Sequence, residues 1–148
     1  DGLGPRIDEV AHRDLSGVLV GAPQEIIPCE PTPLRYLYLM RRKAGSTRHD
    51  YLDYYFHRHS RFGFQTPNIA GYTQFHVDPE ASAAAAARLG LGSTVVDSVS
   101  ELHLESLEAF LAGIGDGRLG AEAAADEERF VDRVNSVSFC TTTRVLAP

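Results

Sequence analysis

The chain has 148 residues, the size of one domain, which predicts a single hydrophobic core and argues against a separate cofactor-binding module. Its formal net charge is −6, so the long-range attraction that drives binding to nucleic acid or to an anionic membrane is missing. No stretch approaches the roughly 18 consecutive apolar residues of a membrane span, and the N-terminus does not resemble a signal peptide. We therefore expect a soluble, cytoplasmic protein that binds neither nucleic acid nor membrane.

Residues 1–33 are interpreted as an extended arm, and residues 34–148 as the domain itself. Five prolines interrupt the arm, and proline blocks long regular elements. One short apolar run at 17–21 is a candidate strand. Cys29 and Cys140 form no CxxC pair, so we expect two ordinary free thiols.

A strand is expected from Leu34, where an apolar run begins whose two alternating faces are both apolar or aromatic. Both faces of such a strand must therefore be buried against other parts of the protein or against a partner. Thr47 and Asp50 then have the spacing of a capping box, which predicts a helix of about four turns. The apolar stripe of this helix follows a period of about 3.6 residues and contains Tyr51, Tyr54, Tyr55, Arg58 or His59, and Phe62.

The middle of the chain predicts two further strands with a helix inserted between them. Residues 69–77 alternate like a strand, with Tyr72, Gln74 and His76 on one face. Asp78 as a cap, followed by proline, predicts a helix at about 79–90. Residues 95–104 then form the third core strand.

The remaining elements are a capped helix at 106–114, a helix at about 121–132 and a closing strand at 136–146. We expect the second helix to bring Phe130, Val131 and Val134 inward and to expose the acidic run 126–129 as a solvated face.

The element order predicts an α+β fold of the ferredoxin-like βαββαβ type, an antiparallel sheet with helices on one face. The other face of the sheet also carries apolar residues. We therefore expect a homodimer that forms through the open sheet face.

The aromatic residues are concentrated in one third of the chain. All six tyrosines, four of the seven phenylalanines and three of the six histidines lie between residues 36 and 75. This pattern fits either a packed core or the lining of a pocket. A packed core explains the phenylalanines well. It explains the tyrosines and histidines less well, because their polar atoms need hydrogen-bond partners when buried.

His59 and His76 are the candidate acid–base groups. His59 lies on the apolar stripe of the first helix, and His76 shares a strand face with Tyr72 and Gln74. If that face meets the helix, two imidazoles, a phenol and an amide converge on one space. Imidazole, with an ordinary pKa of about 6.5, exchanges protons at neutral pH without a cofactor. No metal site is expected at His57 and His59, because an i, i+2 spacing separates the two rings around a helix.

Glu101, His103 and Asp97 belong to the third core strand. They point to the dimer side if Leu102 and Leu104 face the helices, and a hydrogen-bonded interface cluster is then the favoured interpretation. The sequence leaves open whether Glu101 and His103 face the pocket instead.

Five segments in this order resemble the EthD-domain proteins of the dimeric α/β-barrel superfamily: YLMRRKAG at 38–45, YYFHRH at 54–59, PNIAGYTQFHV at 67–77, SELHLESLEAF at 100–110 and DEERFVD at 126–132. The resemblance covers residues 35–147 and implies a ferredoxin-like protomer, dimerisation by sheet packing, and a pocket between sheet and helices. It also implies that the family's helix-end histidine is His59 and that its second-strand tyrosine is Tyr72. The family's usual His-Gly-Pro is His59-Ser-Arg here, so the backbone turn at the pocket mouth should differ.

The sequence contains no motif for a nucleotide cofactor or a common hydrolase, so no cofactor is expected. The leading hypothesis is a cofactor-independent enzyme of the lyase, isomerase or cyclase type that acts on an aromatic or polyketide-like molecule. His59, His76 and Tyr72 are its candidate catalytic residues, and its candidate substrate-binding residues are Tyr38, Tyr55, Phe62, Phe64, Gln74, Ser100 and Leu102. The alternatives are a non-catalytic protein that binds the same compounds and a cofactor-free oxygenase.

Overall fold

The structure, a computed structural model, describes residues 4–9, 11–115 and 117–144. Within these ranges the strands are β1 Gly21–Ile27, β2 Leu34–Met40, β3 Gly71–Val77, β4 Ser98–Leu104 and β5 Val137–Thr142. The helical segments are η1 Gly4–Glu9, η2 Arg13–Leu15, α1 Arg48–Tyr54, η3 Tyr55–His59, α2 Arg61–Gln65, α3 Pro79–Leu89, α4 Leu107–Gly113, α5 Arg118–Glu127 and η4 Arg133–Asn135. None of the helices in these ranges is long and apolar enough to cross a membrane.

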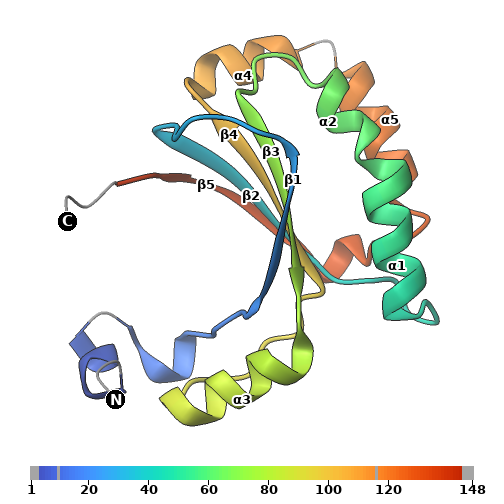
Figure 1. Cartoon of the computed structure of the whole chain (residues 1–148). Helices are drawn as coiled ribbons and strands as arrows, with labels where there is room; N and C mark the ends of the chain where they lie inside the picture. The colour runs from blue at the N-terminus through green and yellow to red at the C-terminus, as the bar shows by residue number, and fades with distance from the viewer. Residues whose placement is uncertain (1–3, 10, 116, 145–148) are drawn as a thin grey trace.

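The strands form one sheet in the order β1-β3-β4-β2-β5, and each neighbouring pair is antiparallel. α1, η3 and α2 connect β2 to β3, and α4 and α5 connect β4 to β5. These helices cover one face of the sheet, whereas α3 lies near the N-terminal segment, at the far end of β3 (Figure 1). The predicted α+β ferredoxin-like fold is therefore confirmed, with one strand added to the βαββαβ unit.

The additional strand, β1, comes from the N-terminal arm. It pairs with the outer edge of β3, beginning with Gly21 opposite Val77. The strand expected at 17–21 is wrong, because it ends where β1 begins. Pro23 lies inside β1, and an edge strand tolerates proline because its outer N–H groups need no partner within the sheet.

The helix predicted after Thr47 forms, with a widened turn in its middle. The Thr47 side chain accepts a hydrogen bond from the Asp50 N–H, as a capping residue does. In η3, a π-helical turn, the Ser60 N–H donates to the Tyr55 carbonyl at 3.2 Å. Tyr55 and His59 lie four residues apart and so share one face of this helical segment. Both are buried.

The buried centre of the core lies between the sheet and these helical turns and consists of Met40, Tyr51, Tyr55, Phe130 and Val131. The ring of Phe130 lies 5.0 to 6.1 Å, between centroids, from the rings of Tyr51, Tyr54, Tyr55 and His59. The expectation that Val134 faces inward is wrong: its side chain is 93% exposed. The cause is that α5 ends at Glu127, so η4 does not continue its apolar stripe.

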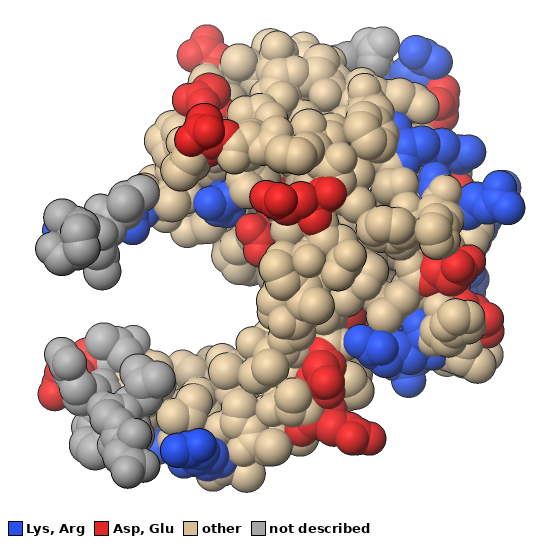
Figure 2. Space-filling model, viewed as in Figure 1, with Lys and Arg blue, Asp and Glu red and all other residues tan. Residues whose placement is uncertain are grey.

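The helices α1, α2, α4 and α5 leave the other face of the sheet uncovered (Figure 1). Figure 2 shows the molecule hollowed on this side, between the part that carries β5 and the lobe that contains α3. Cross-strand pairing places on this face a group of apolar residues, defined here as the open-face patch: Leu37, Leu39, Phe75, Val99, Val137 and Phe139. Phe139 is 45% and Val137 56% exposed, so the β5 end of the patch is accessible to a partner, whereas Val99 is buried.

We expect Phe130→Ala to lower the free energy of unfolding by about 3 to 5 kcal/mol, because it leaves a cavity among four aromatic rings. Urea unfolding measures this change. The matched control is Phe64→Ala, whose side chain is 67% exposed and whose removal should cost about 0.5 kcal/mol or less. Equal losses in the two variants would contradict the assignment of Phe130 to the core.

Candidate functional site

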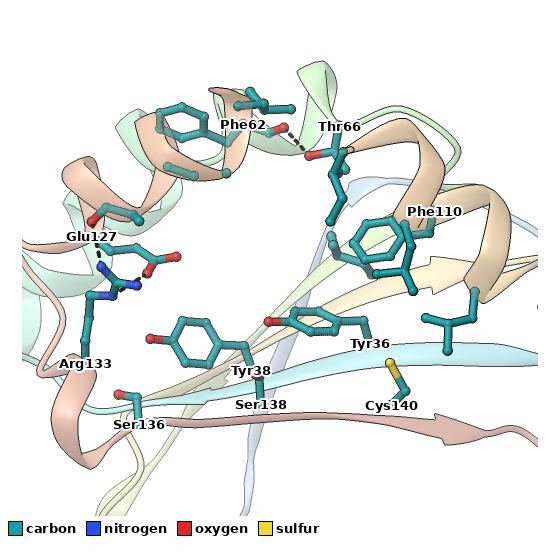
Figure 3. A pocket seen from close by; sticks show the side chains of 18 of the residues that line it. Tyr36, Tyr38, Phe62, Thr66, Phe110, Glu127, Arg133, Ser136, Ser138 and Cys140 are labelled. Carbon is teal, nitrogen blue, oxygen red and sulfur yellow. Dashed lines mark hydrogen bonds and ion pairs between the residues drawn. The ribbon is translucent and has the colours of Figure 1, made fainter. Parts of the chain in front are cut away.

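A cavity with two adjoining chambers lies between the sheet and the helices. The outer chamber, of about 690 Å³, is bounded by β2, β5, α4 and α5 (Figure 3). The inner chamber, of about 120 Å³, lies deeper, against β2, β3, β4 and η3. The chambers adjoin because some residues line both: Tyr36, Tyr38, Phe62, Thr66, Leu102, Ala123 and Glu127. The outer chamber has the size of a small-molecule site, for which about 300 to 1,000 Å³ is usual.

His59 forms part of the wall of the inner chamber and is only 8% exposed. Its Nδ1 lies 2.9 Å from Oδ2 of Asp126 on α5. Because the carboxylate accepts this hydrogen bond, we assign the ring proton to Nδ1, which leaves the lone pair on Nε2 free. Burial lowers the pKa of His59, and the contact with Asp126 offsets only part of this effect. His59 is therefore neutral at pH 7, with Nε2 able to accept a proton.

Asp126 fixes this histidine and is itself held by two other groups. Its Oδ1 accepts a hydrogen bond from the Tyr54 hydroxyl at 2.8 Å and lies 3.4 Å from Nη2 of Arg61. Burial alone would raise the pKa of Asp126, but the hydrogen bonds from His59 and Tyr54 and the charge of Arg61 keep it below its ordinary value. Asp126 is thus a carboxylate, as the orientation of His59 requires.

Glu127, the next residue, lines both chambers. Its Oε1 lies 4.0 Å from Nε2 of His59, and its Oε2 lies 3.3 Å from Nε of Arg133. Burial raises the pKa of Glu127, while the charge of Arg133 works against this rise. A raised carboxyl pKa and a lowered imidazole pKa bring the two groups closer in acidity. Such groups can exchange a proton through a ligand atom placed between them at little cost.

Two phenols complete the inner chamber. The Tyr72 hydroxyl donates to the Tyr55 hydroxyl at 3.2 Å and accepts a hydrogen bond from Nε2 of Gln74 at 2.8 Å. Burial raises the pKa of both tyrosines, so both remain protonated and able to donate. Gly63 allows α2 to lie directly on the Tyr72 ring, because a Cβ there would come within 2.3 Å of the ring. Because Tyr72 donates its proton to Tyr55, the Tyr55 O–H is the donor that this pair offers to a ligand oxygen.

The structure brings most of the predicted site residues to this cavity. The predicted residues that line one or both chambers are His59, Tyr72, Tyr38, Tyr55, Phe62, Ser100 and Leu102. They come from η3 and α2 and from neighbouring positions on β2, β3 and β4, which face the helices in register.

Three predicted residues, His76, Gln74 and Phe64, line neither chamber. His76 faces the helices beyond the inner chamber, with Nε2 3.2 Å from Oε1 of Gln74, and burial lowers its pKa. Gln74 is fully buried and donates to Tyr72 and to the Tyr55 carbonyl, so it supports the tyrosine pair from behind. Phe64 is 67% exposed. It lies two residues after buried Phe62, and side chains two residues apart point to different sides of a helix.

Three residues of the site were not predicted from the sequence. Glu127 and Arg133 line the cavity, and Asp126 orients His59 from behind. The expectation of a solvated face at 126–129 is wrong for its first two residues, since the side chains of Asp126 and Glu127 are 6% and 15% exposed. The available signal was Phe130, which packs inward four residues after Asp126, and residues four apart share a helix face. Arg133 lies in η4, a short turn that no periodic pattern predicts.

Glu101 and His103 point to the open face of the sheet, away from the cavity, because they alternate with residues that line it. Arg35 contacts both: it is hydrogen-bonded to a ring nitrogen of His103, and its Nε lies 4.0 Å from Oε2 of Glu101. Asp97 does not join this cluster, since it accepts a hydrogen bond from the backbone N–H of Arg42 at 2.9 Å.

In the described part of the chain, no group of three or more His, Cys, Asp or Glu side chains is placed to hold a metal ion. Cys29 and Cys140 are both free thiols, and Cys140 lines the outer chamber from β5.

The sheet, its single helical layer and the enclosed cavity together define a ferredoxin-like α+β protein with a site suited to a small molecule. The chain belongs to the EthD domain family: the family model matches residues 43–134, which is more than half of its length.

Two solved structures have a similar fold. One is an ethyl tert-butyl ether D (EthD) family protein from Bacillus halodurans C-125, with a TM-score of 0.55 and 10% identity over 76% of this chain and 100% of the other. The second is a dimeric ferredoxin-like protein of unknown function from Thermobifida fusca YX, with a TM-score of 0.52 and 18% identity over 81% of this chain and 99% of the other. None of the curated proteins compared with the chain gives a significant match.

We expect Asp126→Asn to lower the pKa of His59 further, because it removes the negative charge that favours the imidazolium form. Titration of the histidine ring protons by NMR measures this shift. The control is Asp53→Asn, an equivalent change at a carboxylate that is 60% exposed and lies beside His57, and it should leave the titration of His59 unchanged. A His59 pKa that rises, or does not move, in Asp126→Asn would show that the two groups are not coupled as described.

Proposed function

We propose that this protein is a cofactor-independent enzyme that moves protons on a hydrophobic, aromatic or polyketide-like small molecule. The observation that carries the proposal is the buried His59–Asp126 pair, whose free Nε2 borders a chamber containing a carboxyl group and two phenols. Lyase, isomerase and cyclase reactions on phenols or acidified carbons share this requirement for proton transfer. Membership of the EthD family is compatible with a small-molecule enzyme.

Each group has a distinct part in the proposed chemistry. Nε2 of neutral His59 accepts a proton from the substrate, and Asp126 stabilises the imidazolium that forms. The negative charge that develops on a substrate oxygen is stabilised by a hydrogen bond from the Tyr55 hydroxyl, which itself accepts one from Tyr72. The proton returns to a different substrate atom from His59 or from Glu127, which lies 4.0 Å from it. The net result is a proton relocation that consumes no oxidant and no cofactor.

His76 has no direct part in this proposal, because it does not line the cavity. It is separated from the tyrosine pair by Gln74, which it contacts at 3.2 Å. Substitution of His76 should therefore disturb the site only through the orientation of Gln74.

The experiment is solvent-deuterium exchange into a panel of dihydroxynaphthalenes, followed by NMR, since exchange at a ring carbon reports proton transfer without requiring the natural substrate. We expect the protein to accelerate exchange in at least one compound. His59→Gln should lose about 100-fold or more of that acceleration, in line with the usual contribution of general acid–base catalysis. His76→Gln is the matched control and should retain activity within about tenfold.

Binding of these compounds with no acceleration of exchange would favour the alternative of a non-catalytic binding protein. Acceleration that persists in His59→Gln would remove His59 from its proposed role. Strict dependence of turnover on O2 would instead single out an oxygenase.

We further propose that the protein forms a homodimer by packing the open-face patches of two protomers against each other. The exposed apolar side chains of this patch support the proposal, as does the dimeric state named for the similar Thermobifida fusca protein. The cluster of Arg35, Glu101 and His103 then lies beside the patch, where it can supply polar contacts in a fixed register.

We expect Phe139→Glu to shift the protein toward the monomer, because a charge on the apolar patch loses its hydration in the dimer. Sedimentation velocity measures the distribution. Phe64→Glu is the matched control, on the helical side and 67% exposed, and it should leave the distribution unchanged. A native protein that is monomeric at all concentrations, or a dimer that tolerates Phe139→Glu, would contradict this mode of association.

A further inference from the structure

The outer chamber is chemically divided into two ends. At one end, Glu127 and Arg133 point into the cavity from the helical side, and the hydroxyls of Tyr38 and Ser136 face them from the sheet (Figure 3). The other end is lined by apolar residues of α4 and α5: Leu107, Phe110, Leu111, Ile114 and Leu119. Arg133 is the one cationic side chain among the described residues that line this chamber.

We propose that the outer chamber binds an organic anion, with an apolar ring body against α4 and one acidic substituent, a carboxylate or an ionised phenol, paired with Arg133. The inference deepens the function proposed above, because it names the substrate class of the same cavity. It requires only binding and no chemical step.

The surroundings of Arg133 are suited to such a ligand. Its Nε lies 3.3 Å from Oε2 of Glu127, its Nη1 lies 3.4 Å from the carbonyl oxygen of Ala124, and Nη1 is 4.0 Å from Oε1 of Glu128. The side chain is 43% exposed, so its guanidinium is reachable from the cavity. The Tyr38 hydroxyl is a further hydrogen-bond partner of Arg133. A guanidinium has five N–H donors, so these contacts together still leave a donor for an incoming oxyanion.

Glu127 competes with the proposed ligand anion for the guanidinium of Arg133. It is the better buried member of the pair, at 15% exposed, and burial disfavours its charged form. A ligand anion that approaches Arg133 weakens the contact with Glu127 and further favours the protonated carboxyl. Glu127 then carries a proton on the side of His59, where the proposed reaction needs one.

Two fluorescent probes with the same ring system test this proposal: 1-anilinonaphthalene-8-sulfonate, which is anionic, and N-phenyl-1-naphthylamine, which lacks the sulfonate and is neutral. Fluorescence titration gives a dissociation constant for each probe. We expect Arg133→Met to weaken binding of the anionic probe about tenfold and to leave the neutral probe within about twofold, because only the anion loses a charge-assisted contact. Arg133→Lys should restore part of the loss.

Glu127→Gln should strengthen binding of the anionic probe alone, since it removes the competing carboxylate. Arg58→Met is the charge-matched control on an exposed helix position outside the cavity, and it should change neither affinity. Ser138→Trp places a large ring in the chamber from the edge strand β5 and should abolish binding of both probes.

The proposal is overturned if neither probe binds, if Arg133→Met weakens both probes equally or neither, or if the anionic probe still binds Ser138→Trp. These outcomes are independent of the proposed catalysis, because binding of either probe requires no proton transfer. Loss of exchange activity with intact probe discrimination, or the reverse, separates the two proposals.

Discussion

The buried carboxylate of Asp126 holds the helical layer of this protein together. It accepts hydrogen bonds from Tyr54 and His59 and lies beside Arg61, so α5 is tied to α1, η3 and the start of α2 by one side chain. A buried charge is stable only where such partners replace its lost hydration. The same contact positions both proposed proton carriers, because it orients the imidazole of His59 and fixes α5 so that Glu127 reaches the adjoining chamber.

The fold was predictable because its signals are local. Capping residues mark the helix starts, and alternation with periods of about 2 and 3.6 residues marks the core strands and the first helix. The place of β1 was not predictable, since an edge strand relaxes the rule against proline at Pro23. In the site, alternation correctly grouped Tyr72, Gln74 and His76 on one strand face, which the structure turns toward the helices, but alternation cannot say how far along a strand a cavity extends. Asp126 and Glu127 were missed as residues at the cavity, because charged residues were expected to face the solvent.

The cavity combines a polar inner surface with a mostly apolar outer one. Its inner part contains buried groups that exchange or donate protons, and electrostatic interactions between buried groups are stronger than in solution. Its outer part is mostly apolar, with its charged pair gathered at one end. Since the chambers share Tyr38 and Glu127, a molecule held in the outer part presents one side to the inner groups. Orientation and reactivity are thus set by the same few residues.

The added strand β1 also determines how the sheet meets other β structure. Unpaired backbone groups at a sheet edge are a template for pairing with foreign strands, and proteins limit this hazard with covers and prolines. β1 occupies the edge of β3, and Pro23 removes one N–H donor from the new outer edge. At the opposite edge, β5 carries no proline and keeps exposed Val137 and Phe139. Unwanted strand addition, and with it the first step toward aggregation, is therefore directed to β5.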